Sequence, residues 1–580
     1  MPRTAHRFSR GILCCSIPAL LALPALAGTP EALDHVPSDA QAVVVVPDVG
    51  ELLNDINAAN TVLGDMGQPM VVMMTSMLRG MPGLNLDGSL AAVLSMDPQQ
   101  DDPDVVMLVP VTDFEAFTQG REAKNGLINF PMGPDQMMYV RDAGDGYAVF
   151  GEIAEQVKNY NAAGGNLESH ATRLGKAGAR VSDHNDIFMY VNIPQFKDLI
   201  NMGLQEMEAQ AEMVELMAGP EAAQGVDQMV TAMRTIVNDA ASFTSGLSFD
   251  KTSGLSFDFG LQFVEGSATS SYFDNNGDAS KYYGKVPNID YFMAASYDLS
   301  GAGISKFMTE YMDWISQMDA NGMMGAMGID KMMTGVKGGI QVLGASDNVM
   351  GGLLTNTFYY TELENPKAFI DATRSAYANM AASEEMKQAG VGFEASVDEE
   401  ATEINGIQAY GYSFAMDMSQ MQGMNQMGGP NPAMFMQMLF GGNGPSGYIA
   451  QSGDDGLIMT LSQNPTLLSK VAKAANGENT MSSVASMQKT ASLLPDNRIM
   501  EMYIAADHLA NTAGPMLMMF GILPEFEPIE SLPPLGMGLT ADGGGVLFRT
   551  VLPIETVNKA LDVAKTQMQQ QMQGQNQMDF

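Results

Sequence analysis

The chain of 580 residues carries 67 acidic and 29 basic side chains, which gives a formal net charge of −38. An electrostatic field of that sign repels phosphate backbones, and no basic stripe interrupts it, so the sequence excludes nucleic-acid binding. The length is too great for a single hydrophobic core, so at least two domains are expected.

An export signal is predicted at the N-terminus. Residues 1–27 contain no acidic side chain, begin with three arginines and continue into an apolar run over 11–26. The run ends in Ala25-Leu26-Ala27, the small-x-small pattern that signal peptidases require. Its length and its two prolines suit a cleaved signal better than a retained N-terminal anchor, which is the alternative. We expect cleavage near Ala27 and a periplasmic or secreted protein.

The cysteines limit the chemistry of the exported chain. Both of them, Cys14 and Cys15, lie inside the predicted signal. The mature chain would therefore contain no cysteine, which excludes disulfides, thiolate metal sites and cysteine nucleophiles. No later segment is long and apolar enough to predict a transmembrane helix.

The first predicted segment, 28–282, alternates strands, helices and tight turns. Its landmarks in chain order are a strand over 42–46, a helix through Leu52 and Leu63, strands over 90–96 and 105–111, a turn at Asn125-Gly126, a hairpin at Asp145-Gly146, a helix from Ile153, a strand over 187–193 and a hairpin joining 246–250 to 255–263. Asn-Gly and Asp-Gly pairs tolerate the positive φ angles that tight hairpins need.

The second predicted segment, 283–566, presents comparable landmarks in the same order. They are a strand over 291–297, a helix through Ile304 and Ile315, strands over 340–343 and 353–360, a helix at Asn365-Pro366, a turn at Asn405-Gly406, a hairpin at Asp455-Gly456, a helix at Asn464-Pro465, a strand over 499–505, a hairpin joining 538–542 to 546–552 and a last helix through Val557 and Leu561. Asn as N-cap with Pro at the first helical position starts two of these helices.

The recurrence predicts an internal duplication. We expect an α+β fold made of two tandem pseudo-repeat halves, each with mainly antiparallel sheets covered by helices. Tandem halves often enclose a ligand site, so a cleft between them is a hypothesis.

A methionine-rich insertion over 416–440 distinguishes the second segment. The chain has 51 methionines, compared with 25 Phe and 17 Tyr. Thioether sulfur is a soft ligand that suits Cu(I), which makes five closely spaced methionines candidate copper ligands. They are Met416, Met418, Met421, Met424 and Met427. The alternative is a flexible loop that accommodates apolar partners. A Gln/Met-rich tail over 567–580 has the same bias.

The sequence offers no catalytic residues. His35, His170, His184 and His508 have no metal-ligand spacing, and surface or capping roles are expected for them. Metalloprotease, phosphate-loop and nucleophile-elbow motifs are missing. Ser486 and Lys489 fit Ser-x-x-Lys, but no companion Lys-Thr-Gly follows.

Two aspartate clusters could hold calcium, although solvated turns explain them better. They are Asp97, Asp101, Asp102 and Asp104, and the run from Asp274 to Asp278.

The export signal and the opening Val36-Pro-Ser-Asp-Ala40, followed by strand and helix units, resemble the secreted bacterial proteins of domain-of-unknown-function family 3352. The resemblance covers residues 36 to about 565. The second opening, Val286-Pro287-Asn288-Ile289-Asp290, keeps only the first two positions. This family implies no activity, cofactor or site.

The sequence therefore favours a non-enzymatic exported protein that binds or scaffolds something in the cell envelope. Three alternatives remain open. They are a copper-binding protein, a holdase-like binder of apolar clients, and a hydrolase with a carboxylate-based site. The hydrolase would need a concave site with at least two acidic groups of perturbed pKa.

Overall fold

The computed structural model describes residues 29–64, 68–96, 103–131, 137–218, 220–274, 277–318, 335–346, 351–382, 392–417, 432–442, 444–519 and 526–578. The predicted signal over 1–27 lies outside these residues. The described part combines helices with a 20-stranded antiparallel sheet, so the α+β prediction is confirmed.

The strands form one continuous sheet instead of the separate sheets expected. In the first segment they are β1 (Ala42–Val46), β2 (Leu90–Ser95), β3 (Asp104–Pro110), β4 (Ile128–Pro131), β5 (Met137–Gly144), β6 (Tyr147–Gly151), β7 (Ile187–Asn192), β8 (Ala240–Asp250) and β9 (Gly254–Phe263). In the second they are β10 (Tyr291–Asp298), β11 (Val336–Gly344), β12 (Phe358–Leu363), β13 (Gly392–Val397), β14 (Thr402–Ile404), β15 (Ile407–Asp417), β16 (Ser446–Ser452), β17 (Gly456–Thr460), β18 (Arg498–Ile504), β19 (Leu535–Asp542) and β20 (Gly545–Pro553).

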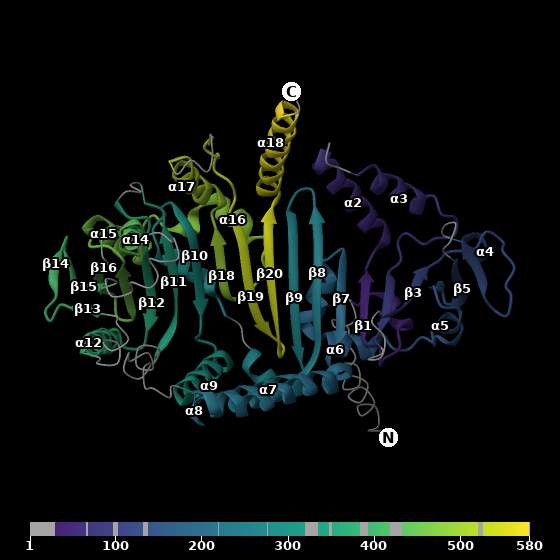
Figure 1. Ribbon diagram of the computed structural model, residues 1–580, viewed down its shortest axis with the longest axis horizontal. Coiled ribbons are helices and arrows are strands. Elements are labelled where there is room, and N and C mark those ends of the chain that lie inside the picture. Colours follow the sequence, from purple (N-terminus) through teal and green to yellow (C-terminus); the bar gives the residue numbers. More distant parts are fainter. Residues whose placement is uncertain are drawn as a thin grey trace, which may run out of the picture.

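Strands β9 and β20 pair at the middle of the sheet (Figure 1). Outward from β9 the neighbours are β8, β7, β1, β2, β3, β6, β5 and β4. Outward from β20 they are β19, β18, β10, β11, β12, β17, β16 and β15, and β15 also pairs with β13 and β14. Both orders connect their strands in the same way along the chain.

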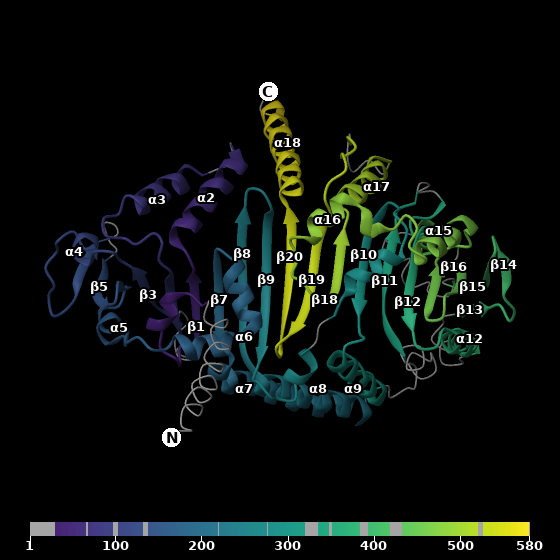
Figure 2. The same cartoon turned by 180° about the vertical axis from the view of Figure 1, so that it is seen from behind.

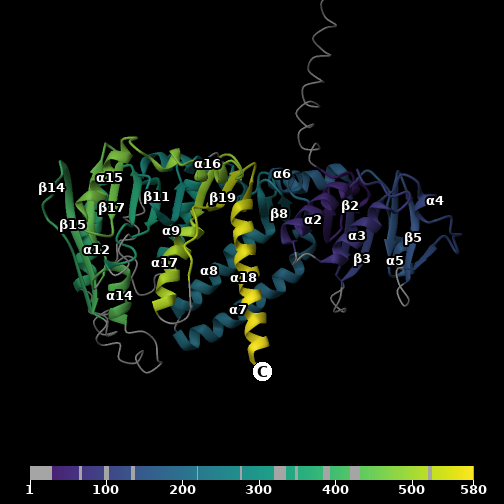
Figure 3. The same ribbon diagram turned by 90° about the horizontal axis from the view of Figure 1, so that it is seen from above.

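The helices lie on both sides of the sheet. They are α2 (Val49–Leu63), α3 (Pro69–Arg79), α4 (Phe114–Phe117), α5 (Ala154–Asn159), α6 (Leu167–His184), α7 (Lys197–Ala218), α8 (Pro220–Asp239), α9 (Ala302–Met318), α12 (Pro366–Ala382), α14 (Pro432–Phe440), α15 (Pro465–Ala475), α16 (Ala485–Ala491), α17 (Ala506–Met519) and α18 (Ile554–Met578). Figure 3 shows α6, α15 and α16 along one side of the sheet, whereas α7, α8 and α18 extend from the other side. In Figures 1 and 2, α7 and α8 cross one end of the central strands and α18 rises from the opposite end.

Helix α6 covers the central strands because small residues let it approach them closely. A Cβ on Gly260 of β9 would lie 3.3 Å from Cγ2 of Val181 in α6. The helix is interrupted at Gly175, whose φ of 55° is left-handed. A Cβ at this glycine would come within 2.3 Å of the Gln262 side chain, so only glycine fits the bend.

Two large clusters form the core on the α6 side. One lies under the first segment and contains Leu33, Leu108, Leu174 and Tyr190. The other lies under the second segment around η6 (Ala279–Lys285) and contains Ile340, Leu468 and Tyr503. These side chains alternate along their strands with outward-facing positions, as expected for sheets covered on one face.

Most turns and caps follow the predicted chemistry. The φ angles are 56° and 82° at Asn125-Gly126, 49° and 81° at Asp145-Gly146, and 52° and 83° at Asn405-Gly406. The Asn464 side chain caps α15 by accepting hydrogen bonds from the backbone N–H groups of Thr466 and Leu467. The hairpin expected at Asp455-Gly456 is present between β16 and β17, but its turn spans 453–455, where Gly453 takes the positive φ of 68° and Gly456 already begins β17.

Regular elements extend into both the methionine-rich insertion and the tail. Strand β15 continues to Asp417, with Met416 opposite Phe393, and α14 occupies 432–440. Residues 418–431 lie outside the described part. Helix α18 continues through the predicted boundary at 566 to Met578.

The strand expected over 353–360 begins only at Phe358. No helix in the described ranges combines the length and apolarity needed to cross a membrane.

Candidate functional site

The six central strands, from β7 through β8, β9, β20 and β19 to β18, have one face that no helix of the described residues buries completely. We call this the open face and the side packed against α6 the covered face. The open face is apolar: five of its side chains are substantially exposed. They are Met189 at 36%, Leu247 at 39%, Phe257 at 36%, Phe259 at 45% and Met500 at 51%. Outward-facing positions of a one-sided sheet are normally polar, so this composition is unusual.

The open-face residues form a continuous row across the sheet. Directly opposed positions in successive strands run Met189, Ser245, Phe259, Phe548, Leu539 and Met500. Five inter-strand spacings of about 4.8 Å make the row about 24 Å long. Met189, Phe259 and Met500 are the substantially exposed side chains of this row. Phe548 and Leu539 are partly buried, and Ser245 is the one polar position.

Aromatic rings occupy the centre of the row. The Phe259 ring lies 6.4 Å from that of Phe243 and 6.5 Å from that of Phe548, centroid to centroid, with interplanar angles of 28°. The β9–β20 pairing places Phe259 opposite Phe548, so rings from both predicted segments meet here. Offset stacking of this kind holds the rings in fixed positions on the open face.

Exposed apolar side chains also occur on the helices that extend from the open-face side. The most exposed is Met73 of α3 at 68%, followed by Met213 of α7 at 61%. Others are Met77, Leu199, Met202, Met233, Ile236, Leu509, Met518 and Val563, from α3, α7, α8, α17 and α18. Methionine surfaces adapt to partners of different shapes.

The covered face of the same strands carries buried charge. Arg549 donates from Nε to Oδ1 of Asp258 at 2.7 Å and from Nη2 to Oδ2 at 2.5 Å. The two side chains are 7% and 0% exposed. Asn185 Nδ2 donates a further hydrogen bond to Asp258 at 2.9 Å. Bidentate geometry and a third donor satisfy the carboxylate in its desolvated site.

A second buried carboxylate, Glu501 of β18, lies on the covered face of the second segment. Arg498 Nε lies 3.0 Å from Glu501 Oε2, and the Tyr503 hydroxyl donates to Glu501 Oε1. Burial and the neighbouring carboxylate raise the pKa of Tyr503 far above its usual value. This tyrosine therefore remains a neutral donor at all physiological pH values.

A cleft of about 480 Å³ opens on the covered face where the two segments meet. We call it the junction cleft. Its floor is β20, through Leu547, Arg549 and Val551, and its walls are Arg180 and His184 of α6 and the loop 492–496. Serines 248, 253 and 256, from the end of the β8–β9 hairpin, complete the lining. Asp496 is its only carboxylate, so this cleft does not meet the two-carboxylate requirement of the hydrolase hypothesis.

Three carboxyl groups with raised pKa values lie elsewhere, and one of them is Asp183 of α6, whose pKa is raised by burial. Burial, then the charges of Asp186 and Glu51, raise the pKa of Asp55 in α2 to about 6. Burial also raises the pKa of Asp186. However, Asp186 Oδ2 accepts a hydrogen bond from the Phe249 backbone N–H at 2.8 Å, and none of the three carboxyl groups lines the junction cleft. The Asp186 contact supports the end of β8.

The four described histidines lie in different environments. His35 and His170 are buried, at 5% and 0% exposure, which corrects the expectation of surface roles for them. His35 Nδ1 pairs with the Ala162 carbonyl and His170 Nε2 with the Val36 carbonyl. His508 lies against Tyr291, and His184 lines the junction cleft. Among the described residues no group of three or more His, Cys, Asp or Glu could hold a metal ion.

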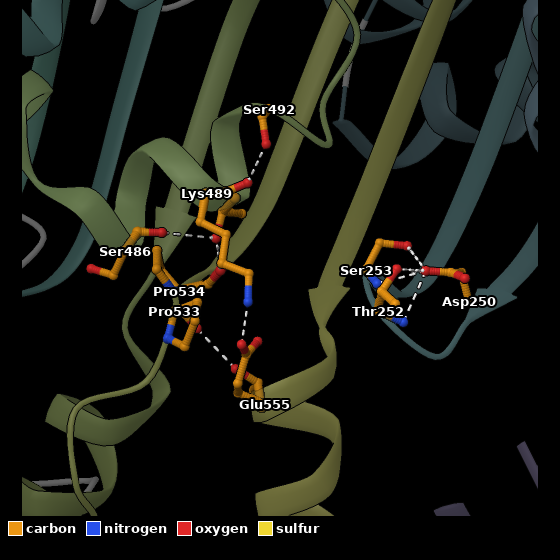
Figure 4. Close-up of polar contacts among 11 residues, drawn as sticks. Asp250, Thr252, Ser253, Ser486, Lys489, Ser492, Pro533, Pro534 and Glu555 are labelled. Atoms are coloured by element: carbon orange, nitrogen blue, oxygen red, sulfur yellow. Dashed lines mark hydrogen bonds and ion pairs between the residues drawn. The ribbon is translucent and has the colours of Figure 1, made fainter. Parts of the chain in front are cut away.

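Ser486 and Lys489 do not form a catalytic pair. Figure 4 shows the Lys489 ammonium directed at the Glu555 carboxylate, with which it forms an ion pair, and away from Ser486. The Ser486 carbonyl instead accepts a hydrogen bond from Thr490 Oγ1 at 3.4 Å. The same view shows Asp250 Oδ1 accepting from Thr252 and Ser253, which closes the β8–β9 turn. These contacts stabilise helix and turn ends.

The copper hypothesis falls mostly outside the described residues. Met416 belongs to β15, whereas Met418, Met421, Met424 and Met427 lie in the range 418–431. Of the aspartate clusters, Asp97, Asp101 and Asp102 also lie outside the described part. Copper binding thus stays a prediction.

Comparison of the chain with protein-family models, with curated proteins and with solved structures gave no match. The resemblance to domain-of-unknown-function family 3352 therefore stays a prediction.

Sequence reasoning missed the open face, and it expected a cleft between the two segments without naming any residue that lines it. The open face could have been found from β9, where Phe257, Phe259 and Leu261 alternate with Asp258 and Gly260. That pattern places large apolar side chains on one face and polar or small residues on the other. Helix α6, which lines the junction cleft, has a spacing signal in Leu174, Gly178 and Val181.

Proposed function

We propose that this chain is an exported, non-enzymatic binding protein that holds apolar clients on the open face of its central sheet. A client here means an extended apolar segment of a non-native polypeptide. The observation that carries the proposal is the set of exposed apolar side chains on the open face, Met189, Leu247, Phe257, Phe259 and Met500, which spread across β7 to β18. Contiguous exposed apolar surface marks interaction sites in soluble proteins.

Energetics favour such a role. Phe259 is 45% exposed. Covering that fraction of a Phe side chain removes roughly 90 Å² from water, which is worth about 2 kcal/mol. Several such residues side by side give useful affinity after the cost of ordering a client. A row about 24 Å long matches an extended segment of about seven residues.

Composition suits a broad range of clients. Methionine side chains rearrange to fit different apolar partners, and promiscuous binders use such surfaces. The net charge of −38 would keep a loaded complex soluble. Export to the periplasm or beyond, which the N-terminal sequence predicts, is part of the same proposal.

The proposal includes an internal duplication into halves 28–282 and 283–566. Its support is the order of strand connections, which is the same outward from β9 and outward from β20. In that correspondence Gly246 of β8 is equivalent to Gly538 of β19. Gly246 pairs with Asp258 of β9, and Gly538 pairs with Arg549 of β20, so Asp258 and Arg549 occupy equivalent positions. The two then oppose each other at the junction. Duplication places equivalent apolar strands side by side and so doubles the width of the open face.

Suppression of aggregation tests the proposed function. Light scattering of a chemically reduced model protein is followed with and without the mature chain. We expect suppression at near-equimolar ratios, weakened at least fivefold by the double substitution Phe259→Ser and Phe548→Ser. The matched control is Met73→Ser with Met77→Ser, which removes exposed methionines from α3. Equal suppression by both variants would place client binding away from the open face.

A further inference from the structure

The junction cleft has a chemical character that differs from the rest of the molecule. It lies on the covered face, so it is separate from the open face and does not rest on the proposed function. Its lining includes Arg180, His184 and Arg549 but only one acidic side chain, Asp496. Both guanidinium groups are ion-paired with carboxylates outside the lining, Arg180 with Asp542 and Arg549 with Asp258, so the cleft offers paired cationic groups and not an excess of positive charge. The N–H groups that these ion pairs do not use are the feature that would attract an anion.

The two arginines are held in place by carboxylates that do not line the cleft. Arg180 donates from Nη2 to Asp542 Oδ2 at 3.0 Å and from Nη1 to Thr540 Oγ1 at 3.3 Å. Arg549 uses Nε and Nη2 for Asp258. Among the described residues, no hydrogen bond is formed by Nε of Arg180 or Nη1 of Arg549. Guanidinium groups fixed in this way lose little conformational freedom when a ligand binds.

His184 adds a third nitrogen-bearing side chain to the lining of the cleft. Its Nδ1 lies 3.2 Å from the Arg180 carbonyl oxygen, one helical turn earlier. That contact fits Nδ1 as the N–H donor and leaves Nε2 for the cleft side. Two arginines and one histidine on two elements, α6 and β20, thus contribute to one cleft.

The remaining lining defines the rest of the ligand. Leu493, Leu494, Leu547 and Val551 provide apolar surface, whereas Ser248, Ser256 and Ser492 provide hydroxyl groups. The volume of about 480 Å³ lies in the range of small-molecule sites and excludes a folded partner.

We propose that the junction cleft binds a small organic anion, whose carboxylate or phosphate group is held by Arg180, His184 and Arg549. Guanidinium groups bind both kinds of anion through paired hydrogen bonds. The apolar side chains and serine hydroxyls would contact the body of the molecule. Because the cleft draws on both segments of the chain, the anion would also bridge them.

Calorimetric titration of the full mature chain with citrate, with inorganic phosphate and with uncharged glucose at constant ionic strength tests this site. We expect citrate or phosphate to bind and glucose not to bind. Preference for citrate assigns a carboxylate ligand, and preference for phosphate assigns a phosphorylated one. Arg180→Gln should weaken anion binding at least tenfold. Lys176→Gln is the matched control, since Lys176 pairs with the same Asp542 at 3.0 Å but does not line the cleft.

A second variant keeps the test decisive if Arg180→Gln reduces stability. His184→Gln leaves the Asp542 contacts intact and should weaken binding at least threefold, with the His184 ring resonances of the unaltered chain shifting as citrate or phosphate is added. The proposal is overturned if neither anion binds, or if Lys176→Gln weakens binding as much as Arg180→Gln. Unshifted His184 resonances on saturation would overturn it as well.

Discussion

The two faces of the central strands have opposite chemistry, although alternating residues of the same strands form both faces. On β9 and β20 the covered face presents Asp258 and Arg549, and the open face presents Phe259 and Phe548. Charge is buried under α6, and aromatic rings remain accessible. A sheet that only needed to fold would reverse this arrangement.

The difference shows where stability and function separate. Outside the junction cleft, groups on the covered face are buried and close-packed, so changes there should affect folding. Groups on the open face are only half-buried, so changes there should affect binding with little effect on folding. The following substitutions test this division, in order of decreasing expected effect.

Arg549→Met should destabilise the protein by about 3–5 kcal/mol, because it leaves the Asp258 carboxylate buried without its cation. Urea-induced unfolding measures the change. The double substitution Asp258→Leu with Arg549→Leu should be less damaging than the sum of the single changes, since neither charge then remains unpaired. Additive effects would show that the pair is not coupled.

Adjacent residues of β9 offer the closest comparison of the two faces. Gly260→Val should destabilise by about 2–3 kcal/mol, because a Cβ there lies 2.4 Å from Thr244 Oγ1 and close to α6. Phe259→Ala, on the open face, should destabilise by only about 1 kcal/mol. Thermal unfolding of both variants shows which substitution destabilises more. A larger loss of stability for Phe259→Ala than for Gly260→Val would reverse the assignment of the two faces.

Asp55→Asn sharpens the comparison at the rim of the open face, where α2 contacts β8. The folded-state pKa of about 6 is higher than the ordinary 3.8, so the folded protein takes up this proton first as the pH falls. Stability should therefore rise as the pH falls from 7 towards 4. Asp55 is half-buried and screened by solvent, so Asp55→Asn should gain about 1 kcal/mol at pH 7.5. That gain should disappear near pH 4 in urea titrations at both pH values, and a constant gain would contradict the cause.

Lys489→Gln provides the smallest effect. Lys489 and Glu555 form an ion pair with side chains 44% and 41% exposed. The Lys489 ammonium lowers the pKa of Glu555, so the pair contributes stability above the ordinary Glu pKa and loses it as the pH falls below that value. Solvent screening should limit the loss at pH 7 to about 0.5 kcal/mol. Chemical unfolding at low and high salt measures it, and a loss comparable to Arg549→Met would contradict the contrast between exposed and buried pairs.

Local features were predictable from the sequence because they depend on neighbouring residues. Asn-Gly turns, the Asn464 cap and strands such as Ala42–Val46 follow from backbone preferences and alternation. The pairing of β9 with β20 joins segments far apart in the chain, and no local pattern specifies it. The identity of the open face depends on where α6 packs, which in turn depends on Gly175 and Gly260. For the same reason the junction cleft could be expected between two halves, but its lining could not be named.

The most direct test of the central claim places an environment-sensitive fluorophore on the open face. Ser245, between Met189 and Phe259 in the apolar row, is changed to cysteine in the mature chain and labelled. Glu168→Cys on α6 is the control on the opposite side of the sheet. Addition of an unfolded apolar polypeptide should shift the emission of the label at 245 to the blue and leave that at 168 unchanged. An unchanged spectrum at 245, or equal shifts at both positions, would contradict client binding on the open face.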